Sequence, residues 1–260
     1  MAVKLVALDI DGTIVPAGQD YPSSRLTEAV ARLREKGIVV VLASGRMFPG
    51  TAAVARHLGL SEPVICQQGC SIHTLDGATL HEFPIERSAA LDIVTYARDL
   101  DHPYEWFNPV RYLCSRQSPS AGEYARLSGI AAEYMDHPEH SNVVPTGVGI
   151  ISSDSEAPGV HRALLDLHAE SLHLLDFPAV TVAVARDANK GHALSLICND
   201  LGIARSDVLS IGDSVNDAAM LEWAGHGVAL AHSDRYALNA ADEVLDPGGP
   251  DPVAALLEQL

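Results

Sequence analysis

The chain has 260 residues, enough for one large domain or two modest ones, and 47% of them are hydrophobic, which is ordinary for a globular protein. Its net charge of −17 disfavours binding to nucleic acid or to anionic membrane surfaces, since both are themselves negatively charged. No apolar stretch approaches the roughly 18 to 20 residues that a membrane-spanning helix needs, and the apolar run over 5–8 is too short for a secretory signal.

The first third of the chain predicts a parallel sheet with crossover helices. Apolar runs rich in β-branched residues alternate with segments of helical periodicity, and glycines end the helices. The predicted strands are residues 3–8, 38–43 and 64–66, and the predicted helices run from Ser23 or Ser24 to Gly37 and over residues 51–58. This β-α-β-α-β order is typical of an α/β fold.

The middle of the chain predicts a different module. Short strands separated by turn residues indicate hairpins and an antiparallel sheet with helices on one face. The expected strands are a hairpin over residues 71–80 and residues 104–107, 111–115, 148–152, 172–177 and 180–185. The expected helices of this module are residues 87–100, 121–134 and 159–170.

The last part of the chain returns to the first pattern. The expected elements are a helix over 191–201, a buried strand over 208–211, a helix over 218–223, a turn-rich stretch over 246–252 and a helix over 253–260. We therefore predict an α/β protein with a Rossmann-like parallel-sheet core formed by residues 1–83 and 185–260. Residues 84–184 form an inserted α+β domain in this prediction.

Two acidic clusters follow predicted buried strands. Asp9 and Asp11 stand near the N-terminus, and Asp213 and Asp217 stand after the strand over 208–211. If both strands belong to one parallel sheet, their carboxyl ends bring these carboxylates to one crevice. The carboxylates would repel one another unless a hard cation lay among them, so the pattern predicts a Mg²⁺ site and phosphoryl chemistry. One carboxylate of the first pair can attack phosphorus while the other exchanges protons, although a capped turn with solvated carboxylates remains an alternative.

Donor groups and one lysine stand at other strand ends and helix starts. Ser44-Gly45-Arg46 follows the second strand, where a hydroxyl and backbone N–H groups can hold phosphate oxygens. Lys190 would offset the charge of a phosphate, and Asn216 could donate a hydrogen bond. A helix cap, a solvated lysine and a capping turn are the alternatives for these three segments. The ordered combination of all of them favours a phosphoryl site.

This ordered set resembles the haloacid dehalogenase-like hydrolase superfamily, and the insertion resembles the cap (cap type C2) of its Cof-type phosphatases. The resemblance covers nearly the whole chain. The segments similar to the family's four motifs are Asp9-Ile10-Asp11-Gly12-Thr13, Ser44-Gly45-Arg46, Lys190, and Gly212-Asp213 with Asn216-Asp217. The chain also departs from the family pattern, because Gln68-Gly69 stands where relatives usually have Asn-Gly after the third strand.

The resemblance implies a role for each of these residues. Asp9 would be the nucleophile and Asp11 the general acid and base. Mg²⁺ would be bound by the Asp9 carboxylate, the Asp11 backbone carbonyl and Asp213, while Asp217 and Thr13 would support the site. The implied substrate- and phosphate-binding residues are Ile10, Ser44, Gly45, Arg46, Lys190 and Asn216.

By this resemblance the protein would be a Mg²⁺-dependent phosphatase that hydrolyses a small phosphorylated metabolite, such as a sugar phosphate, through an aspartyl phosphate. A phosphomutase or phosphotransferase using the same intermediate is the first alternative, and a phospho-accepting signalling module is the second. No nucleic-acid or membrane partner is expected. The four cysteines lack CxxC spacing, which predicts reduced thiols in a cytoplasmic protein. His137 and His140 lie in a Pro-containing loop and are not predicted to bind a metal.

Overall fold

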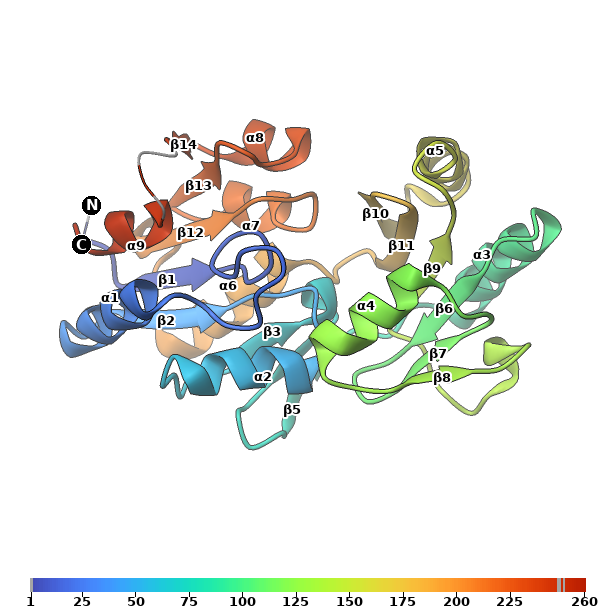
Figure 1. Cartoon of the computed structure of the whole chain (residues 1–260), viewed down its shortest axis with the longest axis horizontal. Coiled ribbons are helices and arrows are strands. Elements are labelled where there is room, and N and C mark those ends of the chain that lie inside the picture. The colour runs from blue at the N-terminus through green and yellow to red at the C-terminus, as the bar shows by residue number, and fades with distance from the viewer. Residues whose placement is uncertain (1, 247–248, 250) are drawn as a thin grey trace. The chain divides into compact units, whose positions relative to one another are not determined.

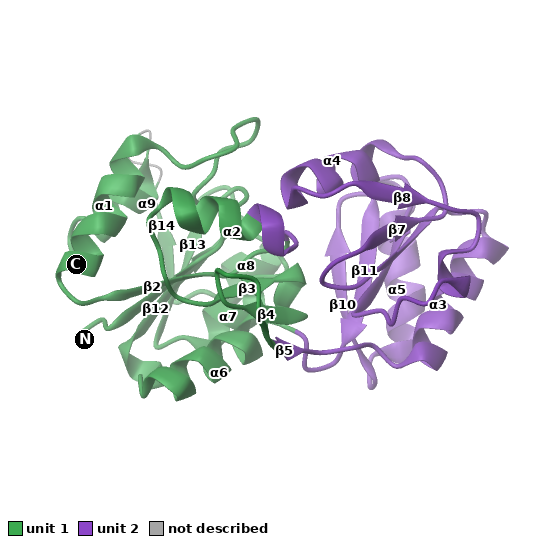
Figure 2. Cartoon of the chain, turned by 90° about the horizontal axis from the view of Figure 1, so that it is seen from below, with its two compact units in different colours: residues 1–45, 51–80, 189–260 green, residues 46–50, 81–188 purple. Residues whose placement is uncertain are grey.

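A computed structural model describes residues 2–246, 249 and 251–260 (Figure 1). Three positions of the predicted turn-rich stretch, 247, 248 and 250, lie outside the described residues. Contacts divide the chain into two compact units (Figure 2). The core unit comprises residues 1–45, 51–80 and 189–260, and the inserted unit comprises residues 46–50 and 81–188.

The core unit is built on a five-stranded sheet in the order β14-β13-β12-β1-β2, with every neighbouring pair parallel. Its strands are β1 (Leu5–Leu8), β2 (Val39–Leu42), β12 (Val208–Gly212), β13 (His226–Leu230) and β14 (Glu243–Leu245). The central strand β1 is fully buried, as expected of an apolar run covered on both faces. Leu8 aligns with Leu42 on one side and with Ile211 on the other, so the residues that follow these three strands meet at one edge of the sheet.

The third predicted strand leaves this sheet. β3 (Val64–Cys66) joins β4 (Ser71–His73) and β5 (Thr79–Glu82) in a separate three-stranded sheet. One parallel bridge, between Ala43 and Ile65, still connects β3 with the end of β2. The turn that follows β3 therefore stays beside the loop that follows β2.

The helices of the core unit begin and end at the local signals that the sequence carries. They are α1 (Ser24–Glu35), α2 (Phe48–His57, whose first residues group with the inserted unit), α6 (Lys190–Leu201), α7 (Ala218–Trp223), α8 (Arg235–Ala240) and α9 (Pro252–Leu257). The Ser23 hydroxyl accepts a hydrogen bond from the Leu26 amide and caps α1. The Asn189 side chain caps α6 in the same way, which makes Lys190 the first residue of that helix.

The inserted unit contains a six-stranded mixed sheet in the order β10-β11-β9-β6-β7-β8. Its strands are β6 (Tyr104–Phe107), β7 (Tyr112–Cys114), β8 (Ala132–Tyr134), β9 (Gly147–Ile151), β10 (Leu172–Phe177) and β11 (Val180–Ala185), and its helices are α3 (Arg87–Asp99), α4 (Pro119–Ser128) and α5 (Ala157–His168). Residues of α3 and α5 pack on one face of the sheet in a hydrophobic core around Trp106. The predicted class, an α/β protein with a parallel core sheet and an inserted sheet-and-helix module, is confirmed.

The helix predicted over 121–134 is wrong in its second half. α4 ends at Ser128, because Gly129 adopts the left-handed conformation at φ 66° and its N–H bonds back to the carbonyls of Ala125 and Arg126. The chain then enters β8, which pairs with β7 in parallel. This pair makes the sheet mixed rather than purely antiparallel.

Among the described residues, no helix combines the length and the apolar character needed to cross a membrane. The four cysteines are all buried and none forms a disulfide.

Glu105 of β6 is a buried carboxyl group in the inserted unit, and it accepts a hydrogen bond from the Tyr112 hydroxyl. Burial raises the pKa of Glu105 to about 7, although the Tyr112 hydrogen bond opposes this shift. Because the folded pKa exceeds the ordinary value of 4.5, the contribution of this group to stability is complete below 4.5 and is lost as the pH rises through about 7. The loss amounts to about 3 kcal/mol.

Replacing Glu105 by glutamine should remove this pH dependence of the free energy of unfolding. The difference from the wild type should be visible roughly between pH 5 and pH 8, where the loss develops. Denaturant unfolding followed by the fluorescence of the buried Trp106, in a Trp223→Phe background, reports on the inserted unit. Glu170→Gln, which changes a fully exposed side chain, should keep the wild-type pH profile. An unchanged slope in Glu105→Gln would contradict the prediction.

Candidate active site

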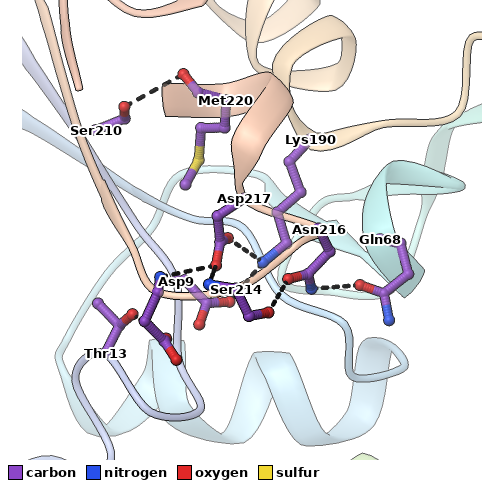
Figure 3. A network of polar contacts seen from close by, with 10 residues as sticks. Asp9, Thr13, Gln68, Lys190, Ser210, Ser214, Asn216, Asp217 and Met220 are labelled. Atoms are coloured by element: carbon purple, nitrogen blue, oxygen red, sulfur yellow. Dashed lines mark hydrogen bonds and ion pairs between the residues drawn. The ribbon is translucent and has the colours of Figure 1, made fainter. Parts of the chain in front are cut away.

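The carboxyl edge of the core sheet brings together residues that are far apart in the sequence (Figure 3). Asp9 follows β1, Asp213 and Asp217 follow β12, and Lys190 opens α6. The Asp9 amide donates to the Ile211 carbonyl at 3.0 Å, which extends the β1–β12 pairing to the position of Asp9. The parallel register of β1 and β12 therefore brings Asp9, Asp213 and Asp217 to one place, as the sequence predicted for these three residues.

Lys190 lies at the centre of this network and its side chain is fully buried. Its ammonium group contacts Asp9 Oδ1 at 2.5 Å and Asp217 Oδ1 at 2.6 Å. A buried lysine is stable only when its charge is paired, and two carboxylates pair it here. The lysine thus holds the Asp9 carboxylate in one orientation.

Asp217 also organises the loop that follows β12. Its second oxygen, Oδ2, accepts hydrogen bonds from the amides of Asp213 and Ser214, both at 3.0 Å. A side chain at Gly212 would collide with the Asp217 carboxyl group, so only glycine allows this close approach. Both oxygens of Asp217 are therefore engaged within the protein.

Asp213 is held by the turn that follows β1. The Thr13 hydroxyl donates to Asp213 Oδ1 at 2.6 Å. Gly12 has φ 86°, and a Cβ atom there would lie 2.5 Å from Asp213 Oδ2. Glycine at this position thus allows both the left-handed turn and the close approach of the Asp213 carboxylate.

Burial dominates the electrostatics of the site. It raises the pKa of Asp9 well above its usual range, and the charge of Asp217 adds to the effect while Lys190 opposes it. Burial likewise raises the pKa of Asp213 to about 6. Burial alone would lower the pKa of Lys190, but the charges of Asp217 and Asp9 outweigh it and raise that pKa, so the lysine stays protonated. Lys190 thus contributes one positive charge beside three carboxyl groups, and it cannot neutralise all of them when they are ionised.

The donor set fits a hard cation. Asp9, Asp213 and Asp217 each offer a carboxylate oxygen, and these oxygens lie within 4.8 Å of one another. Oxygen ligands alone, without histidine or cysteine, match Mg²⁺ rather than a softer metal. Asp9 and Asp213 are the more available of the three, since Lys190 and two amides already occupy Asp217.

The other predicted residues lie around this network. Ser44 is buried and its amide donates to the Ile65 carbonyl at 2.9 Å, while Ile10 is buried beside Asp9 in sequence and Asp11 is half-buried. Asn216 is 8% exposed, and its Oδ1 accepts from the Ser214 hydroxyl at 2.6 Å.

Gly45 and Arg46 follow Ser44. A Cβ atom at Gly45 would lie 2.7 Å from Gln68 Nε2, so this glycine borders the site through Gln68. Arg46 is buried and groups with the inserted unit. The phosphate-binding roles of these residues remain predictions.

Three contacts of the site were not predicted from the sequence. Gln68 Oε1 accepts a hydrogen bond from Asn216 Nδ2 at 2.5 Å, and the Ser214 hydroxyl donates to Asn216 Oδ1 of the same side-chain amide. The His232 ring nitrogen Nε2 lies 2.9 Å from the Gly12 carbonyl oxygen. The sequence signals for Gln68 are its place shortly after a strand, as for Ser44, and its position in Gln68-Gly69, where the family pattern usually has Asn-Gly.

A second cluster with metal-ligand chemistry lies in the inserted unit. It comprises His137, Glu139 and His140, around the short 3₁₀ turn Pro138–His140. The buried Glu139 carboxylate already accepts from the Tyr104 hydroxyl at 2.6 Å and lies 3.5 Å from the Arg98 guanidinium. These partners account for the burial of the Glu139 carboxylate, and that the cluster does not bind a metal stays a prediction.

Comparison with known proteins identifies the family. A family model described as haloacid dehalogenase-like hydrolase matches residues 6–257. The chain belongs to the haloacid dehalogenase-like hydrolase family. The resemblance inferred from the four motifs is thereby confirmed, as is the prediction that the protein is a hydrolase.

Individual relatives of this family member are similar to it over 98% to 100% of their own length. The phosphatase YwpJ of Bacillus subtilis (strain 168) is 27% identical over 285 residues, which cover 99% of this chain and all of the relative. A haloacid dehalogenase-like hydrolase structure from B. subtilis has a TM-score of 0.86 at 23% identity, covering 99% of this chain and 100% of that chain. The structure of BT4131, described as a sugar phosphatase of subclass IIB, has a TM-score of 0.85 at 19% identity, covering 99% and 98% of the two chains. At these identities the structural likeness concerns the fold.

Proposed function

We propose that this hydrolase is a Mg²⁺-dependent phosphatase that acts on a small phosphorylated metabolite, a sugar phosphate or a similar phosphomonoester, through an aspartyl phosphate. The observation that carries the proposal is the buried Asp9 carboxylate, held by Lys190 at 2.5 Å, with Asp213 and Asp217 beside it. The names of two relatives, the phosphatase YwpJ and the sugar phosphatase BT4131, support the reaction class.

In the proposed reaction, a carboxylate oxygen of Asp9 attacks phosphorus and the bond to the substrate's ester oxygen breaks. Asp11 donates a proton to the leaving oxygen, and then takes a proton from the water that attacks phosphorus and releases Asp9. Lys190 orients Asp9 for attack and places its positive charge where charge develops on the phosphoryl oxygens. The amides near Ser44 and Gly45 and the side chain of Asn216 supply further donors in this proposal.

Mg²⁺ fits the same site, where the Asp9 carboxylate, the Asp11 carbonyl and Asp213 would hold it, and when bound it would offset the charge of the phosphoryl oxygens. Asp217, whose two oxygens bind Lys190 and the backbone, would act as the support of this arrangement.

The reaction can be tested with p-nitrophenyl phosphate in the presence of Mg²⁺. A hydrolase releases p-nitrophenol and inorganic phosphate in equal amounts, whereas a phosphotransferase or mutase releases less phosphate when an alcohol or sugar acceptor is added. Absence of both products from the wild-type protein would refute the proposal. A panel of sugar phosphates, nucleotides and other phosphomonoesters then identifies the substrate class.

Replacing Asp213 by asparagine should raise the Mg²⁺ concentration needed for half-maximal activity by at least about tenfold. Asparagine keeps the acceptor for the Thr13 hydroxyl, so the change removes charge rather than shape. Mg²⁺ titration of activity after treatment with EDTA measures the effect. Asp200→Asn, which changes an exposed residue of α6, should leave the requirement unchanged. The assignment of Asp213 to the metal is wrong if both variants require as much Mg²⁺ as the wild type.

A further inference from the structure

Gln68 holds the amide group of Asn216 from one side (Figure 3). Asn216 Nδ2 donates to Gln68 Oε1 at 2.5 Å, and the Ser214 hydroxyl donates to Asn216 Oδ1 at 2.6 Å. Both amide side chains are at most 9% exposed. With its oxygen and one N–H engaged, the Asn216 amide has a single orientation, in which the second N–H of Nδ2 is directed elsewhere.

The backbone that carries Gln68 is strained. Gln67, Gln68 and Gly69 have φ values of 51°, 65° and 103°, so two consecutive residues with side chains adopt the left-handed region. Each such residue costs on the order of 1 to 3 kcal/mol, and strain of this kind persists only where surrounding contacts impose it. Glycine would occupy position 68 at lower cost, which indicates that the glutamine side chain itself is needed there.

The turn at Gln68 contacts three of the residues predicted to bind the phosphoryl group. The backbone N–H of Gln68 donates to the Ser44 carbonyl at 3.2 Å. A Cβ atom at Gly45 would lie 2.7 Å from Gln68 Nε2, so the glutamine amide covers the Gly45 Cα atom. A Cβ atom at Gly69 would lie 2.7 Å from the Lys190 amide nitrogen, so this turn also packs against the start of α6.

We propose that Gln68 is a positioning residue of the phosphoryl site, which fixes the Asn216 amide so that its remaining N–H faces a phosphoryl oxygen. This inference rests on the proposed phosphatase function. Donors that stabilise a transition state act strongly only when their orientation is set before the reaction. Gln68 sets the orientation of Asn216 from a strand end 148 residues away in sequence.

Two substitutions distinguish the contribution of the Gln68 side-chain amide from that of the strained backbone at this position. Gln68→Met keeps the side-chain volume but removes the hydrogen-bond acceptor, and Gln68→Gly removes the side chain while relieving the left-handed strain. Both should lower kcat/KM for p-nitrophenyl phosphate by at least about tenfold and weaken inhibition by orthovanadate by a similar factor, because a misdirected donor affects the transition state most. The melting temperature of Gln68→Gly should be no lower than that of the wild type. A loss of activity in this variant would then reflect positioning of Asn216 and not a weakened fold. Gln259→Ala, at an exposed glutamine of the C-terminal segment, is the control expected to leave activity unchanged.

A double-mutant cycle with Asn216→Ala decides whether Gln68 acts through Asn216. In the Asn216→Ala background, Gln68→Gly should lower kcat/KM by less than about twofold, because the donor it positions is already absent. Additive losses, or wild-type kcat/KM in both Gln68 variants of an active enzyme, would overturn this inference and leave the proposed function intact. An inactive wild-type protein would overturn the proposed function and this inference with it.

Discussion

Replacing Asp9 by asparagine should lower the turnover of p-nitrophenyl phosphate by at least about ten-thousand-fold, because a neutral amide cannot form the acyl phosphate. The same change should not weaken the fold. Asparagine keeps an oxygen acceptor for Lys190, which contacts Asp9 Oδ1 at 2.5 Å in the wild type. Activity and thermal unfolding measured on one preparation test both parts.

The stability part of this prediction follows from the direction of the Asp9 pKa shift. Burial raises the pKa of Asp9 above its ordinary value of 3.8, so the stability contributed by this group is complete below 3.8 and is lost as the pH rises through the folded pKa. The ionised form of Asp9 therefore stabilises the fold less than the protonated form does, and asparagine, which carries no charge, avoids that cost. The variant should melt at the wild-type temperature or above it.

The matched control is Asp200→Asn, which makes the same chemical change at an exposed position of α6. It should retain full activity. Undiminished turnover in Asp9→Asn would eliminate Asp9 as the nucleophile. A loss of activity together with a large loss of stability would instead show that Asp9 serves mainly to pair Lys190.

Replacing Lys190 by methionine should lower the stability of the core unit by about 3 to 5 kcal/mol, the usual cost of leaving buried charges without their partner. The lysine side chain is fully buried and pairs with Asp9 and Asp217, whose side chains are 6% and 0% exposed. Methionine fills a similar volume, so the effect reports on charge rather than on a cavity. Amide hydrogen exchange in β1 and β12 measures the stability of the core unit separately from that of the inserted unit.

A second substitution tests the cause of this loss. Adding Asp217→Asn to Lys190→Met removes one of the two unpaired carboxylates and should restore part of the lost protection. Wild-type protection in Lys190→Met alone would mean that the ion pairs contribute nothing net to the fold. A loss that the second substitution does not relieve would point to packing instead.

Much of the candidate site was predictable because its residues stand at local signals. Asp9 and Asp213 follow apolar runs, Ser44 follows another, and Lys190 follows the helix cap Asn189. Each of these features spans only a few consecutive residues, so no knowledge of distant contacts is needed to recognise it. The parallel pairing of β1 with β12 then follows from their burial and from the crossover helices.

Other features were not predictable for a physical reason. The helix predicted over 121–134 ends before Gly129, a local stop signal that the prediction did not use, but the pairing with β7 that makes residues 132–134 a strand is not visible in the local sequence. Strand pairing is a non-local contact, and it overrides the weaker local preference.

Local residue patterns were enough to predict the α/β class, the order of the motifs, the acidic character of the site and the family to which the chain belongs. The tertiary structure alone decided which groups touch: Lys190 between Asp9 and Asp217, Thr13 on Asp213, and Gln68 on Asn216. Element identity depends on neighbours in sequence, whereas hydrogen bonds between side chains 27 to 200 residues apart depend on how strand ends and helix starts converge in space. Gln68 shows the difference most clearly, since its left-handed backbone and its contact with Asn216 exist only in the folded chain.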